Sequence, residues 1–377
     1  MGTPLNILSA RTSVYLLTEH CTGRDNHSIS IPARPAVIIA IRSGKHRSIM
    51  NLYILGGRQR KRLLWPVVAE HRFEAARIIR LDTDAHTSNT IVEYETLPEA
   101  RAHRKSSNLF TSGTVCANKL YTCTYTEILV FELPTFRRLA YLSLPRFNAL
   151  HHVCPTRRGT LLVANTGLDM VMEIAGDGRV LREWNVLGDH AWGRSSQDID
   201  YRKVPSTKPH RSHPNFVFEI GDDVWVTRFH QRDAICLTNP AKRIDISIER
   251  PHDGLLHDGL LYFTTVDGHL VIVDAKSLEM VSTFDLRQFR GREFSGPGWC
   301  RGLLVVNKDL VWVGFTRIRK TLLMQSLNWI KHGFRGVDAP THVSLFNLAQ
   351  KQCVESINLE SHGMNILFGI FNAGVFG

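Results

Sequence analysis

Short apolar segments alternate with polar turns along most of the chain, and the pattern recurs at intervals of about 40 residues. The clearest unit runs from His252 to Leu286 and has short apolar segments separated by His-Asp-Gly, Val-Asp-Gly and Asp-Ala-Lys turns. Turns of this chemistry at such close spacing favour antiparallel strands over helices. The units that begin at Thr111 and His152 repeat the arrangement. Because four antiparallel strands per repeat are typical of a propeller blade, we predict an all-β fold.

The number of repeats predicts a six-bladed β-propeller. Six positions hold an equivalent place at the start of a unit, namely Thr111, His152, His213, His252, Cys300 and His362. A seventh blade within residues 10–70 is the alternative. The last inner strand, near 365–371, meets the end of the sequence before its blade is complete, so N-terminal strands should close the ring. The candidates for these strands are Val37–Ile41, Arg77–Leu81 and Thr90–Tyr94. We expect one domain over residues 1–377.

Long insertions should lie over one face of this propeller. In a four-stranded blade, the outer-to-inner connection and the connection between the second and third strands share a face. The segments 187–212, 290–299 and 315–341 occupy such connections. Long loops in a compact domain are usually functional, so we expect a covered pocket on this face. Trp192 and Tyr201 would either cover the pocket or pin the first insertion to the body of the protein.

The six equivalent positions also predict a site on the propeller axis. Each of the first five precedes an apolar strand by 9 or 11 residues. Both gaps are odd and differ by two, so the side chains should face the same way. The predicted ligands of one transition-metal ion are His152, His213, His252, His362 and Cys300, with iron or copper favoured and zinc possible. Thr111 would leave an open side for substrate or water. A metal-free catalytic pocket and a structural role for the histidines are the alternatives.

Accessory residues are expected near the same face. Asp253 would orient a histidine ligand as its hydrogen-bond partner or take part in catalysis. Arg228 and Arg301 would hold a substrate carboxylate or phosphate through paired hydrogen bonds, or else bind carbonyl groups of a neighbouring blade. Asn165 occupies the position in its repeat unit that is equivalent to the position of Arg228 in the next unit. His151 should face the opposite side of its strand from His152, which makes it a weaker candidate.

Composition narrows the class of ligand and the compartment. The formal net charge is +11, but no basic helix with interleaved aromatic residues accompanies it, so we expect a small-molecule substrate and no nucleic acid. The seven cysteines form no CxxC pair. Neither a secretory signal nor an apolar stretch long enough to span a membrane is visible, which favours a cytoplasmic location with no membrane partner. The oligomeric state stays open.

The four-stranded units and the N-terminal ring closure resemble the six-bladed propellers of the strictosidine-synthase, gluconolactonase and paraoxonase superfamily. That resemblance implies a calcium site built from Glu, Asn and Asp, whereas the equivalent positions here hold His and Cys. The ring of histidines is similar in principle to that of carotenoid-cleaving oxygenases, which are propellers that hold iron with four histidines.

These patterns predict a metalloenzyme that acts on a polar or anionic small molecule, with oxygenase-like oxidoreductase chemistry. Arg228, Arg301 and Asp253 are the expected catalytic residues. One alternative is a hydrolase or lactonase that uses histidine acid–base or zinc-water chemistry. Another is a propeller that binds a partner without catalysis. No GxGxxG, GxxxxGK[ST], GxSxG or HExxH motif is present, which disfavours dinucleotide, nucleoside-triphosphate and α/β-hydrolase chemistry.

Overall fold

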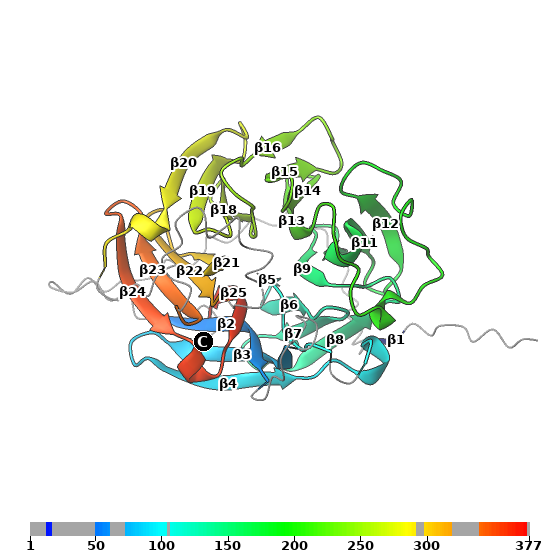
Figure 1. Cartoon of the computed structure of the whole chain (residues 1–377), viewed down its shortest axis with the longest axis horizontal. Helices are drawn as coiled ribbons and strands as arrows, with labels where there is room; N and C mark the ends of the chain where they lie inside the picture. Colours follow the sequence, from blue (N-terminus) through cyan, green and yellow to red (C-terminus); the bar gives the residue numbers. More distant parts are fainter. Residues whose placement is uncertain are drawn as a thin grey trace, which may run out of the picture.

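Six antiparallel sheets are arranged as blades around a common axis, so the protein is a six-bladed β-propeller (Figure 1). The computed structural model describes residues 13–16, 50–60, 72–103, 106–291, 298–318 and 339–374. The prediction of an all-β fold with six blades is confirmed. The seven-blade alternative is wrong, because the N-terminal strands complete existing sheets and do not build a further one.

Three blades follow one another in the first half of the ring. Blade 1 contains β5 (Gly113–Cys116), β6 (Lys119–Cys123), β7 (Ile128–Glu132) and β8 (Arg138–Ser143). Blade 2 contains β9 (Leu150–Pro155), β10 (Leu161–Asn165), β11 (Met170–Ile174) and β12 (Val180–Asn185). Blade 3 contains β13 (Pro214–Ile220), β14 (Asp223–Arg228), β15 (Asp233–Cys236) and β16 (Arg243–Asp245). In each blade the first strand lies nearest the axis (Figure 1).

Two further blades and a composite one complete the ring. Blade 4 contains β17 (Leu255–His257), β18 (Leu260–Thr264), β19 (His269–Asp274) and β20 (Met280–Asp285). Blade 5 contains β21 (Trp299–Val305), β22 (Leu310–Thr316), β23 (His342–Asn347) and β24 (Gln352–Asn358). Blade 6 contains β25 (Ile366–Asn372), β2 (Asn51–Gln59), β3 (Phe73–Asp82) and β4 (Thr87–Tyr94). Short 3-10 turns lie between strands, namely η2 (Pro98–Ala100), η3 (Thr166–Leu168), η4 (Tyr201–Lys203), η5 (Leu286–Gln288) and η7 (Glu360–His362).

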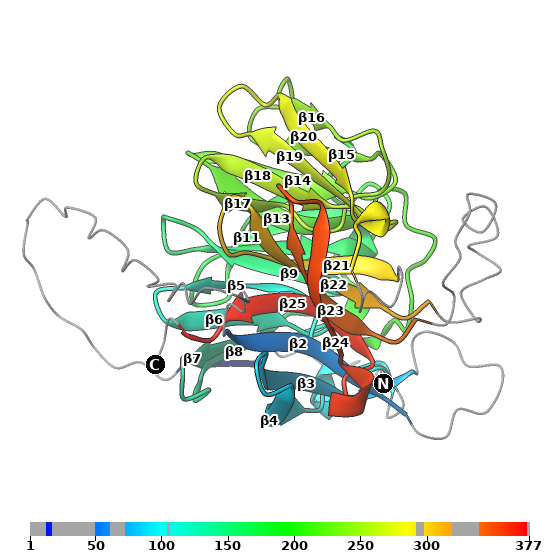
Figure 2. The same cartoon turned by 90° about the vertical axis from the view of Figure 1, so that its left-hand side faces the viewer.

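Blade 6 joins the last strand of the described chain to strands from the N-terminal region, as predicted. Its inner strand β25 pairs with β2, and β2 continues to β3 and β4 (Figure 2). The predicted strands 77–81 and 90–94 lie within β3 and β4. The remaining strand is β2, whereas the predicted segment 37–41 lies outside the described residues. The close approach of β2 and β25 requires glycine, because a Cβ at Gly56 would lie 1.9 Å from the carbonyl oxygen of Ile366.

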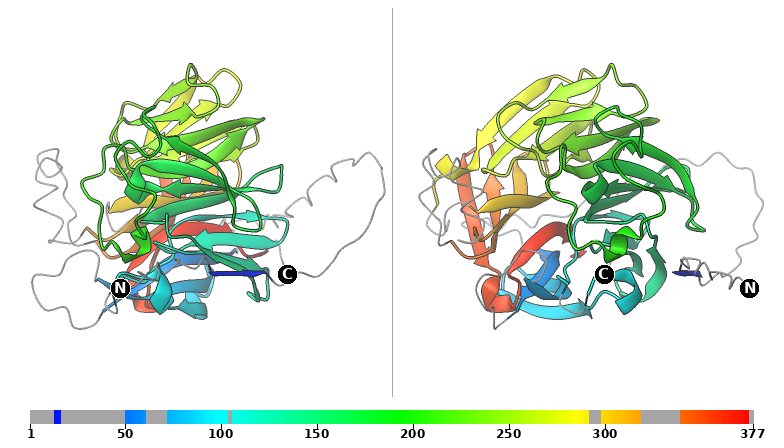
Figure 3. Two further views of the ribbon diagram at one scale, coloured as in Figure 1. Left: turned by 90° about the vertical axis from the view of Figure 1, so that its right-hand side faces the viewer. Right: turned by 45° about the vertical axis from the view of Figure 1, so that its right-hand side comes forward.

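The outer edge of blade 1 carries one more strand. β1 (Ser13–Leu16) pairs antiparallel with β8, so that Ser13 lies opposite Ser143 and Leu16 opposite Ala140 (Figure 3, dark blue). An added strand satisfies hydrogen-bonding groups that the edge of a sheet otherwise exposes. The N-terminal region therefore contributes to blade 1 as well as to blade 6.

The hydrophobic core lies between neighbouring blades. Phe218 and Trp225 of blade 3 pack with Phe263 and Val271 of blade 4, and all four side chains are buried. The middle strands are covered on both faces, which explains why they read as continuous apolar runs and not as strict alternation. Among the described residues no helix is long and apolar enough to cross a membrane.

Most inner strands contain a bulge near the axis. In β9, β13, β21 and β25 the pairing register shifts so that the inner strand has one residue more than its partner. Blade 4 also has one extra residue on its inner side, and this residue lies between the Pro251–Thr265 bridge and the first pair of β17. A bulge redirects a side chain that regular alternation would place on the other face. The residues at the axis are therefore determined by these bulges as well as by strand periodicity.

Candidate functional site

A cavity of about 770 Å³ opens at the propeller axis. Its wall includes residues at the starts of the inner strands and residues that follow the second strands, such as Tyr125 and Phe229. Residues 204–210 of the insertion between β12 and β13 also line it. The cavity thus lies on the face expected from the loop connections. A volume of this size accommodates a drug-sized molecule.

Five of the histidines in the cavity wall form a cluster, namely His151, His210, His213, His230 and His252. The ring centroid of His213 lies 4.8 Å from that of His151, 5.0 Å from that of His210 and 6.3 Å from that of His230. The rings of His151 and His252 are 6.3 Å apart. Two blades, the insertion and the loops beside them therefore contribute to one imidazole cluster.

Burial keeps these imidazoles neutral. Desolvation lowers the pKa of His151 and of His213 well below the usual value, and it lowers the pKa of His210 to about 4. Burial also lowers the pKa of His252, although the neighbouring Asp253 carboxylate opposes this shift. A neutral imidazole has a free nitrogen lone pair, so the cluster can accept protons or bind hydrogen-bond donors near pH 7.

Asp169 of blade 2 positions the segment that carries His213. Its carboxylate accepts hydrogen bonds from the backbone N–H groups of Arg211, Ser212 and His213 at 2.7, 3.0 and 2.7 Å. His213 has a positive φ of 61°, which a non-glycine residue adopts only when its surroundings hold it there. The Nδ1 atoms of His210 and His213 are 2.7 Å apart, so one of them donates to the other.

His252 and Asp253 form a pair on the inner side of blade 4. The Nδ1 atom of His252 lies 3.5 Å from a carboxylate oxygen of Asp253. The other oxygen of Asp253 accepts from the backbone N–H of Gly302 at 2.9 Å and from the hydroxyl of Thr264. These bonds fix the carboxylate, and a carboxylate partner at Nδ1 leaves Nε2 of His252 as the basic nitrogen.

His151 has a similar orientation. Its Nδ1 donates to the carbonyl oxygen of Ala149 at 2.9 Å, because a carbonyl can only accept. The lone pair is then on Nε2, and no group in the described part of the chain occupies it. Two histidines in the wall therefore present basic nitrogens whose tautomer an oxygen acceptor determines.

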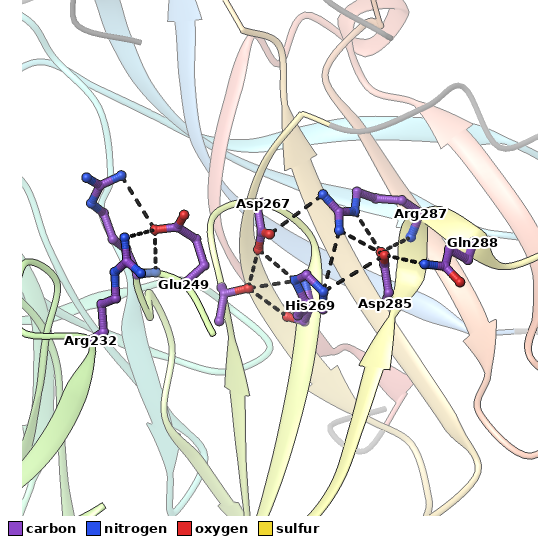
Figure 4. Close-up of polar contacts among 9 residues, drawn as sticks. Arg232, Glu249, Asp267, His269, Asp285, Arg287 and Gln288 are labelled. Carbon is purple, nitrogen blue, oxygen red and sulfur yellow. Dashed lines mark hydrogen bonds and ion pairs between the residues drawn. The ribbon is translucent and has the colours of Figure 1, made fainter. Parts of the chain in front are cut away.

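Two separate groups of polar contacts involve blade 4, the segment before it and the turn between β14 and β15 (Figure 4). Glu249 contacts Arg232 and Arg250 at 3.7 and 3.5 Å, immediately before the segment that carries His252. Nearby, Asp267 accepts from Nδ1 of His269 at 2.9 Å, while Asp285 pairs with Arg287 at 2.7 Å (Figure 4). Of these residues only Arg250 lines the cavity, so the other contacts support the wall from outside the site.

The insertion is tied to the body of the propeller by Asn148. Its amide nitrogen donates to the carbonyl oxygens of Tyr201 and Val204 at 2.8 and 3.0 Å, and its amide oxygen accepts from Thr207 at 3.1 Å. Trp192 donates to Glu183 at 2.7 Å, and Tyr201 is buried. The two aromatic residues thus pin the insertion and do not line the cavity.

Arg301 lies at the bulge of β21 and lines the cavity, as expected for a substrate-binding residue. Its guanidinium carbon is 4.4 Å from the ring centroid of Phe368 and 5.9 Å from that of Trp299. Nε is buried with no hydrogen-bond partner. Desolvation lowers the pKa of Arg301 to about 10, so the group keeps its positive charge at neutral pH.

His152 is not in the cavity wall, in contrast to the prediction. It is buried between three blades, where Nε2 donates to the carbonyl oxygen of Gly113 at 3.1 Å and Nδ1 accepts from the N–H of Val217 at 3.3 Å. Its ring stacks on Phe216 with centroids 3.6 Å apart. The bulge in β9 explains the difference, because it directs His151 to the cavity and His152 to the blade interface.

The other predicted ring positions also lie apart. Cys300 has no exposed surface and belongs to the apolar core around blade 5. His362 lies in η7 on the outer part of the propeller, where Nδ1 is 2.9 Å from the hydroxyl of Ser88. Thr111 is buried and donates to the carbonyl oxygen of Cys123 at 3.0 Å. Of the six positions, only His213 and His252 line the cavity.

Arg228 and Asn165 have structural contacts. Arg228 forms a two-pronged ion pair with Asp233 at 2.8 and 2.6 Å and donates to the carbonyl oxygen of Val186 from the preceding blade at 2.9 Å. Asn165 accepts from the N–H of Asn148 at 3.0 Å. Neither side chain lines the cavity. The expected substrate role of Arg228 is therefore replaced by the alternative, an arginine that joins blades.

The predicted set of five metal ligands is not assembled, because His152, His362 and Cys300 point elsewhere. Across the residues that the structure describes, no three side chains of His, Cys, Asp or Glu are arranged to hold a metal ion. Sequence reasoning passed over His210 and His230 and ranked His151 below its neighbour. The paired His151-His152 sequence and His210, one of two histidines in the long insertion, were the available signals.

Comparisons with known proteins establish the fold but no family. No family model and no curated protein matches the chain. A protein of unknown function from Bacteroides caccae superposes with a TM-score of 0.54 at 13% identity, covering 86% of this chain and 99% of that one. A structure from a nidogen/laminin complex gives 0.50 at 9% identity, covering 85% and 98%. A streptogramin B lyase gives 0.46 at 12% identity, covering 86% and 95%. At these identities the first two similarities support the propeller architecture alone, and no conclusion is drawn from the third.

Proposed function

We propose that this protein is an enzyme that uses histidine acid–base chemistry to hydrolyse an ester or lactone bound in the axial cavity. The observation that carries the proposal is the His252–Asp253 pair at 3.5 Å in the wall of that cavity. A neutral imidazole whose tautomer is set by a fixed carboxylate has the arrangement of a general base. This is the hydrolase alternative of the sequence analysis, in its metal-independent form.

The reaction requires one proton to move twice. Nε2 of His252 takes a proton from water as the water oxygen bonds to the carbonyl carbon. The bond between that carbon and the leaving oxygen then breaks, and the imidazolium returns the proton to the leaving oxygen. His151 offers a second neutral imidazole, with its ring 6.3 Å away. Asp253 stabilises the imidazolium between the two steps.

The oxygenase prediction depends on a ring of histidine ligands, and three of its five proposed members lie outside the cavity. We therefore place the hydrolytic function first. Participation of a transition-metal ion stays a prediction, and elemental analysis of protein purified without a His-tag tests it. A hydrolase of the proposed kind keeps its activity after exhaustive dialysis against a chelator.

A panel of γ- and δ-lactones and phenyl and 4-nitrophenyl esters tests the function. In the H252Q variant we expect kcat/KM to fall by about 10²- to 10⁴-fold, the usual contribution of a general base. The matched control is H362Q, which changes a histidine that does not line the cavity and should leave activity unchanged. Because burial lowers the pKa of His252, the decline of activity in acid should have its midpoint below that of an ordinary histidine. Full activity in H252Q, or no turnover of any panel member, would refute the proposal.

A further inference from the structure

The charges around the cavity have one sign. Its wall contains six arginines and one lysine, namely Arg72, Arg101, Arg202, Arg250, Arg301, Arg317 and Lys208. No aspartate or glutamate is among the described residues that line it. The five neutral histidines of the cluster do not offset this charge. A cavity lined by one sign of charge concentrates ligands of the opposite sign.

Most of this positive charge already has a carboxylate partner behind the wall. Arg202 pairs with Asp200 at 2.7 Å, and Arg317 pairs with Glu360 at 2.7 Å. Arg250 lies 3.5 Å from Glu249. Paired arginines of this kind contribute mainly to holding the loops in place, since their charge is largely compensated.

Arg301 differs from these arginines. It makes no hydrogen bond and no ion pair with any residue in the described ranges, and its Nε is buried. One face of the guanidinium is covered by Phe368 at 4.4 Å. A buried polar atom with no partner is unfavourable by about 1–3 kcal/mol, and by more for a charged group, so a bound ligand that supplies the missing acceptor would gain that energy.

The surroundings of Arg301 restrict the shape of this ligand. Phe368 and Trp299 form an apolar part of the wall near the guanidinium, and Ile366 and Val266 also line the cavity. A planar carboxylate matches the two parallel donors of a guanidinium, whereas the apolar wall favours a hydrocarbon body next to it.

We propose that the cavity selects a carboxylate-bearing small molecule, whose carboxylate pairs with Arg301 and whose apolar, preferably aromatic, body packs against Phe368 and Trp299. This inference names the substrate class and rests on the proposed function for its catalytic part, because the hydrolysed bond would lie next to His252. Binding of the carboxylate itself is independent of catalysis.

Calorimetric titration with matched probes tests the inference. The probes are 3-phenylpropionate, its neutral amide 3-phenylpropionamide, and inorganic phosphate. We expect the carboxylate to bind about 10- to 100-fold more tightly than the amide, which is the usual effect of a charge-assisted hydrogen bond. Equal affinity for carboxylate and amide, or no binding of the carboxylate, would overturn the proposal. Binding of phosphate as tightly as the carboxylate would also overturn it, in favour of a phosphate-bearing ligand.

Variants locate the effect at Arg301. R301Q should bind both phenyl probes with the same low affinity, whereas R250Q, which removes a paired arginine from the same wall, should keep the preference for the carboxylate. Retained preference in folded R301Q contradicts the assignment. If R301Q does not fold, the comparison of the two probes on the unaltered protein still decides the question.

The catalytic and binding proposals can fail separately. H252Q should bind 3-phenylpropionate as the unaltered protein does while losing hydrolysis. If H252Q loses hydrolysis but Arg301 has no influence on binding, the function stands and the substrate class is wrong. If Arg301 governs binding but H252Q hydrolyses normally, the substrate class stands and the catalytic assignment is wrong.

Discussion

Replacement of His152 tests whether this residue holds three blades together through hydrogen bonds or binds a metal ion. The ring donates to Gly113 of blade 1, accepts from Val217 of blade 3 and itself belongs to blade 2. The H152F variant keeps an aromatic ring against Phe216 but loses both hydrogen bonds. Each bond contributes about 1 kcal/mol, and each buried partner left without a bond adds about 1 kcal/mol or more. We expect the free energy of unfolding to fall by about 3 kcal/mol at pH 7.5.

The pH dependence of the free energy of unfolding gives a second expected magnitude for His152. Burial lowers the pKa of His152 to about 3 from its usual value of 6.5. Between these values the unfolded chain binds a proton that the folded protein does not, so stability decreases as the pH falls, by about 1.4 kcal/mol per pH unit. At pH 5 this amounts to about 2 kcal/mol, a loss that H152F does not suffer. The difference between the two proteins should therefore shrink from about 3 to about 1 kcal/mol.

Urea unfolding followed by tryptophan fluorescence and circular dichroism at pH 7.5, 6 and 5 measures these differences. The metal content per chain, determined by mass spectrometry, is the control and should be the same in both proteins. A variant as stable as the unaltered protein at pH 7.5 would refute the interpretation, and so would parallel stability curves across the pH range. Loss of a bound metal with no loss of stability would restore the metal-ligand prediction.

Three further predictions concern the ring and its core. Replacing Gly56 with alanine should lower the free energy of unfolding by about 3 kcal/mol, measured by urea unfolding, because the added Cβ meets the Ile366 carbonyl oxygen at 1.9 Å; a neutral effect would contradict the tight closure. The D233A variant leaves Arg228 without its ion pair and should be destabilised by about 3 kcal/mol in the same assay, whereas unchanged stability would show that the pair contributes nothing. Cys300 should resist iodoacetamide in the folded protein, since burial raises the pKa of its thiol well above the usual value; rapid alkylation seen by mass spectrometry would contradict this.

The architecture was predictable because it depends on features that repeat. Turn residues and apolar segments recur from blade to blade, and each recurrence strengthens the same interpretation. Ring closure followed from an incomplete last blade, which only N-terminal strands were able to finish. The position of the 187–212 insertion over the axis followed from the order of strands in a blade. None of these inferences required knowledge of a side-chain direction.

The residues of the site were less predictable, because the direction of each side chain depends on bulges of a single residue. The odd spacing from His152 to its strand assumed regular alternation, and the bulge between Ala164 and Asn165 removes that regularity. His210 lies outside any inner strand and has no equivalent in other blades. Arginine is a residue type that often binds substrates, which made Arg228 a candidate. Its role is decided by Asp233, a neighbour whose pairing with Arg228 only the folded structure shows.

Because of the bulges in the inner strands, the positive charge of Arg301 acts on histidines in the same cavity and helps to keep them neutral. His151 and Arg301 both reach the cavity through an extra residue in an inner strand. The positive charge of Arg301 helps to lower the pKa of His151 and of His252, so it keeps them unprotonated and able to accept a proton. A carboxylate bound to Arg301 would cancel much of that charge. The imidazolium formed during general-base catalysis would then be more stable with substrate bound than without it. The group that binds the substrate would thereby also favour the protonated state through which the reaction passes.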